Sequence, residues 1–182
     1  MLRIGLAAVS LLLVALWAVA QVPAALVGQA RPVPDQTPPS VATALERCVQ
    51  LMGATRFESF TAGPSMVRGR KVVLVARSES VALVCTVDGA RTTTWHREIH
   101  HDKAVGSSGL VGDPPNGDWY VHGAVRADVA GLSIRTTSGH IVAARVSGGS
   151  FLVDLTGVRE DELPYMRVHQ ALDARGAVLY EG

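Results

Sequence analysis

The chain has 182 residues, with 17 lysines and arginines against 16 aspartates and glutamates. A nearly neutral balance of this kind argues against binding nucleic acid, or an anionic membrane surface, through bulk charge. About 150 residues follow an apolar N-terminal run, which is enough for one domain with a real core and too few for two.

The N-terminal run Ile4–Ala20 contains no charged residue and follows the short basic start Met1-Leu2-Arg3. As a helix it would be about 25 Å long, slightly less than a hydrocarbon core of about 30 Å, and it reaches that thickness if it continues to residue 27. Ala18-Val19-Ala20 is also a small-x-small cleavage pattern. We therefore expect residues 1–27 to be either an uncleaved membrane anchor or a cleaved signal peptide. Both alternatives export the rest of the chain.

Residues 28–40 are rich in proline, which favours an extended, stiff linker. The domain then begins with a helix predicted over Val41–Met52, because Ser40 can cap its start and Gly53 can end it. We expect residues 41–182 to form a single extracytoplasmic domain.

The two cysteines, Cys48 and Cys85, both lie in the exported part. An even number of cysteines in an oxidising compartment predicts a disulfide between them. Cys48 lies in the apolar stripe of the predicted helix, and Cys85 shares a strand face with Leu83 and Val87, so the helix can dock on that face. Closing this loop should stabilise the fold by roughly 3–4 kcal/mol. A reactive thiol pair would need a C-x-x-C motif or an activating neighbourhood, and the sequence shows neither.

Alternation of apolar and polar residues with period two predicts a series of strands after the helix. The ranges are Lys71–Arg77, Val81–Val87, Arg91–Ile99, Trp119–Arg126, Gly131–Thr137, His140–Ser147, Ser150–Thr156, Met166–Asp173 and Ala177–Glu181. Residues 54–69 are expected to be irregular, and His100–Asp118 is expected to be a long loop that is either mobile or functional. This spacing predicts a mainly β fold, an antiparallel β-sandwich or Greek-key arrangement, with one helix linked to the sheet by the disulfide.

The second half has the motif V-A-G-L-S-I-R-T-T-S-G-H-I-V-A-A-R-V-S-G-G-S-F, followed by A-L-D-A-R-G-A-V-L. With a helix cysteine and then a strand cysteine before D-G, it resembles the β-rich domain of uncharacterised exported proteins of actinobacteria. The resemblance implies export and a β-rich fold, and it implies no activity.

The segment Trp95–Asp102 holds three of the six histidines, His96, His100 and His101. On a strand, His96, Glu98 and His100 would share a face about 6.6–7 Å apart, and on a helix His96 and His100 would be one turn apart, as zinc sites prefer. These histidines, with Glu98 or Asp102, are candidate zinc or copper ligands. The alternative is a solvent-facing strand end with alternating polar residues. The segment is not H-E-x-x-H, the motif of many metalloproteases.

Three aromatic residues, Trp95, Trp119 and Tyr120, flank the predicted long loop. They can form a carbohydrate- or protein-binding surface, or they can fill the core.

The sequence contains no G-x-S-x-G, S-x-x-K or phosphate-binding glycine motif. We therefore expect a non-enzymatic module that senses or binds an envelope protein or the cell wall. It should contact the membrane through residues 1–27 if these are uncleaved, and it should bind no nucleic acid. The rival hypothesis is a zinc- or copper-binding exported protein with hydrolytic chemistry.

Overall fold

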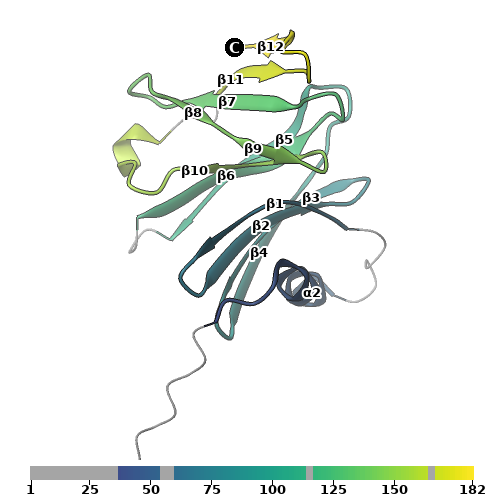
Figure 1. Cartoon of the computed structure of the whole chain (residues 1–182), viewed down its shortest axis with the longest axis vertical. Coiled ribbons are helices and arrows are strands. Elements are labelled where there is room, and N and C mark those ends of the chain that lie inside the picture. Colours follow the sequence, from purple (N-terminus) through teal and green to yellow (C-terminus); the bar gives the residue numbers. More distant parts are fainter. Residues whose placement is uncertain (1–36, 54–59, 114–116, 164–166) are drawn as a thin grey trace, which may run out of the picture. The chain divides into compact units, whose positions relative to one another are not determined.

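The computed structural model describes residues 37–53, 60–113, 117–163 and 167–182 (Figure 1). Within them, strands form three four-stranded antiparallel sheets that accompany one α-helix. The expected mainly β fold with antiparallel sheets is thereby confirmed. The expected hydrophobic helix and most of the proline-rich linker lie outside the described residues, and no helix of the described part is long and apolar enough to cross a membrane.

Helix α2 (Val41–Leu51) begins at the residue that its sequence predicts and ends one residue before the predicted end, with Met52 as its C-cap. The Ser40 hydroxyl accepts a hydrogen bond from the Thr43 amide at 3.1 Å, which satisfies one of the free N–H groups of the first turn. Gly53 follows the last turn with φ of 94°, a conformation that glycine adopts without a steric cost.

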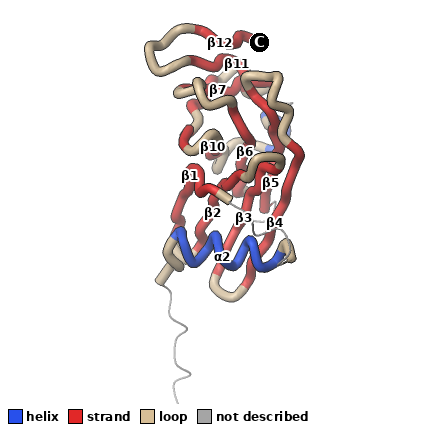
Figure 2. Tube along the Cα trace, turned by 90° about the vertical axis from the view of Figure 1, so that its right-hand side faces the viewer, coloured by secondary structure: helices blue, strands red, loops and turns tan. Residues whose placement is uncertain are grey.

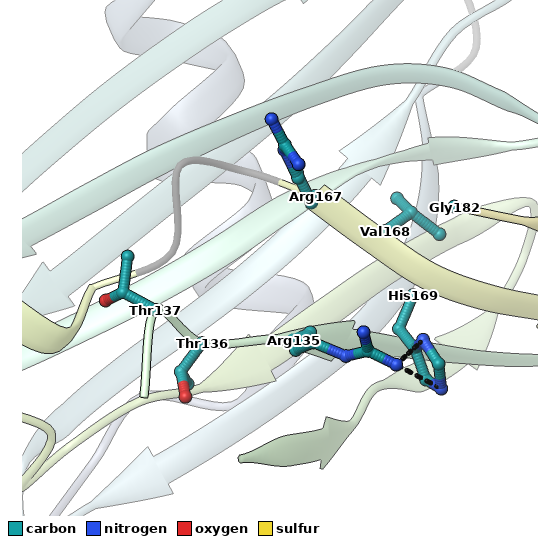
Figure 3. A pocket seen from close by; sticks show the side chains of 7 residues that line it. All are labelled: Arg135, Thr136, Thr137, Arg167, Val168, His169 and Gly182. Atoms are coloured by element: carbon teal, nitrogen blue, oxygen red, sulfur yellow. Dashed lines mark hydrogen bonds between the residues drawn. The ribbon is translucent and has the colours of Figure 1, made fainter. Parts of the chain in front are cut away.

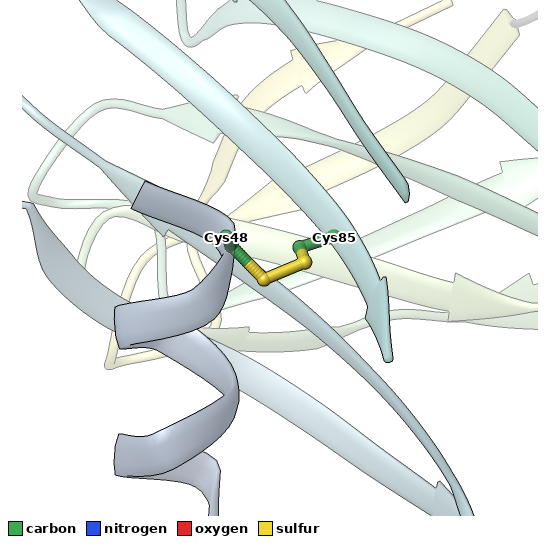
Figure 4. Close-up of a disulfide and its surroundings, with 2 residues drawn as sticks. All are labelled: Cys48 and Cys85. Atoms are coloured by element: carbon green, nitrogen blue, oxygen red, sulfur yellow. A yellow bond between two sulfur atoms is a disulfide. The ribbon is translucent and has the colours of Figure 1, made fainter. Parts of the chain in front are cut away.

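Helix α2 covers one face of the first sheet and is joined to it by the predicted disulfide between Cys48 and Cys85 (Figure 4). The two Cα atoms are 6.0 Å apart, within the usual range for a disulfide, and both side chains are fully buried. The disulfide lies in an apolar cluster whose other members are Ala44, Val72, Leu74, Ala76, Leu83 and Val87. Such a bond is consistent with an extracytoplasmic location.

The first sheet has the strand order β1-β2-β3-β4. Its strands are β1 (Thr61–Arg68), β2 (Lys71–Arg77), β3 (Val81–Asp88) and β4 (Arg91–Glu98). The central strands β2 and β3 are buried on both faces, because α2 covers one face and the second sheet covers the other (Figure 2). Strand β1 corrects the expectation that residues 60–69 are irregular: Pro64 is accommodated on this edge strand at a shift of register between Ala62 and Ser65.

The second sheet has the order β5-β6-β10-β9. Its strands are β5 (Val105–Asp113), β6 (Asp118–Val125), β10 (Ser150–Asp154) and β9 (Arg145–Ser147). Strand β5 lies within the range that was predicted as a loop, so that prediction is wrong for residues 105–113. The pairing of β5 with β6 keeps its glycine-rich backbone extended.

The third sheet has the order β12-β11-β7-β8. Its strands are β12 (Val178–Glu181), β11 (Arg167–Leu172), β7 (Gly131–Arg135) and β8 (Ile141–Ala143). The single strand predicted over His140–Ser147 is in fact two, β8 and β9, which belong to different sheets. The chain changes sheets at Ala144, whose amide donates to the Leu132 carbonyl at 2.8 Å.

The elements are stacked as four layers, α2 and then the three sheets in chain order (Figure 1). Between the first and second sheets lies a cluster of Met66, Val73, Val75, Val84, Val111, Tyr120 and Leu152. Between the second and third sheets lies a larger cluster centred on Phe151, Leu155 and Ile134. Gln36–Gly182 forms one compact unit that contains all of these cores and the disulfide, so it has what a chain needs to fold by itself.

Candidate functional site

A pocket of about 410 Å³ opens on the third sheet, where the ends of β7 and β11 meet. It is lined by Arg135, Thr136, Thr137, Arg167, Val168, His169 and Gly182. No aspartate or glutamate is among these described lining residues, whereas two arginines and a histidine are. The side chains that line the pocket are therefore cationic, and Gly182, the last residue of the sequence, adds a main-chain carboxylate to the lining.

The two arginines are brought together by strand pairing, since Arg167 lies directly opposite Arg135 in the register of β11 and β7. Like charges in directly opposed positions destabilise a sheet unless something neutralises them. The register shifts between Val168 and Gln170, so His169 is an extra residue of β11 without a partner on β7. Such bulges re-aim side chains and are frequent near functional sites.

The Arg135 guanidinium donates a hydrogen bond to Nδ1 of His169 at 2.9 Å (Figure 3). The same guanidinium nitrogen lies 3.5 Å from Nε2, and because an arginine can only donate, the ring nitrogen that it bonds acts as the acceptor. The Arg167 side chain is directed away from this pair in Figure 3, and among the described residues it has neither an ion-pair nor a hydrogen-bond partner. Its long, exposed side chain can rotate to cover a ligand in the pocket.

The hydroxyl groups of the two threonines in the pocket are already hydrogen-bonded within the protein. The Thr136 hydroxyl accepts from the His140 amide at 3.0 Å, and the Thr137 hydroxyl donates to the Asp161 carbonyl at 3.3 Å. The groups left to meet a ligand are therefore the guanidinium groups and the His169 imidazole. Planar guanidinium groups suit phosphate and carboxylate oxygens, which they can bind with two parallel hydrogen bonds.

The histidine segment predicted from the sequence lies elsewhere, at the end of β4. His96 and Glu98 are exposed on the strand, and His100, His101 and Asp102 are exposed in the segment that follows. Within the described ranges, no group of three or more histidine, cysteine, aspartate and glutamate side chains is arranged to hold a metal ion. The zinc or copper site stays a prediction, and the arrangement of these side chains does not favour it.

The aromatic residues that flank the predicted loop have three different environments. Tyr120 is buried and belongs to the core between the first two sheets. Trp119 is half-buried and lies over Gly112, where an added Cβ would approach its ring to 2.1 Å. Trp95, in contrast, is 42% exposed. One of the three is therefore available to a ligand.

A further titratable group, His122 of β6, was not singled out from the sequence. Its side chain is 3% exposed, and Nδ1 has no hydrogen-bond partner among the described residues. Burial, and then the positive charge of Arg97, lower the pKa of His122 to about 4. The imidazole is therefore neutral at physiological pH and contributes no charge to a binding site.

Comparisons of the chain with protein-family models, with curated proteins and with solved structures gave no match. The class of protein is therefore argued from the residues alone. What the described residues show is a layered β unit with a pocket that two arginines line.

Proposed function

We propose that the protein is a non-enzymatic binding module of the cell envelope, and that the pocket on the third sheet binds an anionic group, a phosphate or a carboxylate, of its partner. The observation that carries the proposal is the pair Arg135 and Arg167, two cations at directly opposed strand positions that both line the pocket, with no aspartate or glutamate side chain among the described lining residues. An anion in the pocket would relieve their repulsion.

The location rests on separate observations. The apolar run of residues 1–27 and the disulfide both fit export, and we propose that the stacked sheets form a sandwich-type domain on the outer side, either anchored or released. N-terminal sequencing of the protein recovered from the host's envelope tests this part. A start at Gln21 means a cleaved signal, a start at Met1 in the membrane fraction means an anchor, and recovery from the cytoplasm contradicts export.

The binding site is tested by titrating inorganic phosphate into residues 36–182 and following backbone amide shifts by NMR. We expect shifts that centre on β7 and β11 and that weaken as salt rises, because exposed charges are screened. Arg135→Gln and Arg167→Gln should each weaken binding by about tenfold, the effect of losing a charged hydrogen bond. Arg175→Gln is the matched control, because Arg175 is an exposed arginine outside the pocket.

A phosphate group can come from a small molecule or from a lipid headgroup. Cosedimentation with phosphatidylglycerol vesicles, compared with phosphatidylcholine vesicles, distinguishes the two. Binding to phosphate alone assigns a soluble anion, and binding to the anionic vesicles that is lost in Arg135→Gln assigns a headgroup. If neither ligand binds, or if Arg175→Gln weakens binding as much as the pocket variants do, the proposal is wrong.

A further inference from the structure

A second concave site lies between the first two sheets, at the edge formed by β4 and β5. It has a volume of about 150 Å³ and is lined by Lys71, Thr86, Asp88, Arg91, Thr93, Trp95, Val111, Gly112 and Tyr120. Its volume is smaller than the 300 Å³ or more that is usual for a complete small-molecule ligand. This cleft therefore fits one unit of a longer molecule.

We propose that the cleft binds a neutral saccharide chain, with one sugar ring stacked on the Trp95 indole and its hydroxyl groups bonded to the polar residues around it. Trp95 is on the edge strand β4 and is 42% exposed although it lines a hollow. A flat, exposed indole beside polar groups matches a sugar ring, which has an apolar face and a rim of hydroxyls.

The floor of the cleft is formed by Tyr120, which is 3% exposed. Its hydroxyl is fully buried, so a ligand would meet the ring of Tyr120 and not the hydroxyl. Burial raises the pKa of Tyr120, and Asp118 adds to the effect, so the phenol keeps its proton.

The charged residues of the cleft argue for a neutral ligand. Lys71 Nζ lies 2.6 Å from a carboxylate oxygen of Asp118, and Asp88 is bound by Arg70 at 2.6 Å. Lys71 and Asp88 are thereby neutralised inside the protein, and Arg91, an exposed residue of β4, is the remaining charged group of the lining. They still offer hydrogen bonds, together with the hydroxyls of Thr86 and Thr93. An anion would find more unpaired positive charge in the other pocket, which two arginines line.

The test is a titration of residues 36–182 with soluble tetrasaccharides of glucose and of N-acetylglucosamine, followed by tryptophan fluorescence and by calorimetry. We expect at least one of them to bind and to change the emission of Trp95, the more exposed of the two described tryptophans. Trp95→Ala should weaken binding at least tenfold. Tyr180→Ala is the control, because Tyr180 is also an exposed aromatic residue, 45% exposed, and lies outside the cleft.

The proposal is overturned if no tetrasaccharide binds to the folded protein at millimolar concentration, or if Trp95→Ala binds as well as Tyr180→Ala. It is also overturned if a proline-rich peptide, and no saccharide, binds in a way that depends on Trp95. Arg135→Gln should leave saccharide binding intact, which keeps this test separate from that of the anion pocket.

Discussion

Reduction of the disulfide is the perturbation whose magnitude follows most directly from the structure. Cys48 and Cys85 are 37 residues apart. A cross-link that closes a loop of this length lowers the entropy of the unfolded chain by about 13 cal/mol/K, which is about 4 kcal/mol at 25 °C. For a unit of this size, each kcal/mol changes the melting temperature by about 3 °C. We therefore expect reduction to lower the melting temperature by about 12 °C.

The assay is thermal unfolding of residues 36–182, followed by circular dichroism with and without reductant. A thiol titration must show two free thiols in the reduced sample, because both sulfurs are buried and react slowly when folded. Cys48→Ala is the control, since it has no disulfide to lose and should be insensitive to reductant. Oxidised and fully reduced samples that melt within about 3 °C of each other would refute the entropic account of this cross-link.

Two other predictions follow from buried positions. His122 has a pKa of about 4 in the fold against 6.5 as its ordinary value, so the unfolded chain takes up a proton first as the pH falls. The free energy of unfolding should therefore decrease by about 3 kcal/mol between pH 6.5 and 4. In urea unfolding, His122→Leu should flatten this part of the pH profile, and an unchanged profile would contradict the assignment. Gly123→Ala should cost about 3 kcal/mol or more, because an added Cβ would lie 1.9 Å from the Ser107 carbonyl oxygen and 2.7 Å from the Phe151 ring. Gly131→Ala is the matched control, since its Cβ would meet nothing closer than 3.6 Å, and equal losses in the two variants would show that close packing is not the cause.

The helix, the disulfide and most strands could be predicted from the sequence because each has a local signal. A cap at Ser40, a stop at Gly53 and valine-rich runs with period two need no knowledge of the rest of the fold. Strand β5 has no such signal, because Gly106, Gly109 and Gly112 interrupt it at every third residue. These glycines make room for neighbouring groups, the His122 ring against Gly109 and the Trp119 ring against Gly112. Tertiary contacts therefore decide the conformation of β5, and strand propensity does not.

The candidate sites, like strand β5, depend on tertiary contacts that local sequence signals do not reveal. Arg135 and His169 are 34 residues apart and meet only because β7 pairs with β11. The sequence predicted both strands but contained no indication that they are neighbours. The clustered histidines, in contrast, are conspicuous in the sequence, yet they lie on an exposed strand end where their side chains do not converge. Proximity along the chain is a poor guide to a site in an antiparallel fold, since strands that pair can be far apart in sequence.

The position of the disulfide has a mechanical consequence. Any tension that reaches the domain through its N-terminal segment enters at Val41 and can unwind α2 only as far as Cys48. There the load passes through a covalent bond to Cys85, in the middle of β3, a strand that is hydrogen-bonded to a neighbour on each side. A pull on the N-terminal segment is thus shared between two rows of hydrogen bonds and cannot separate the edge strand β1 first.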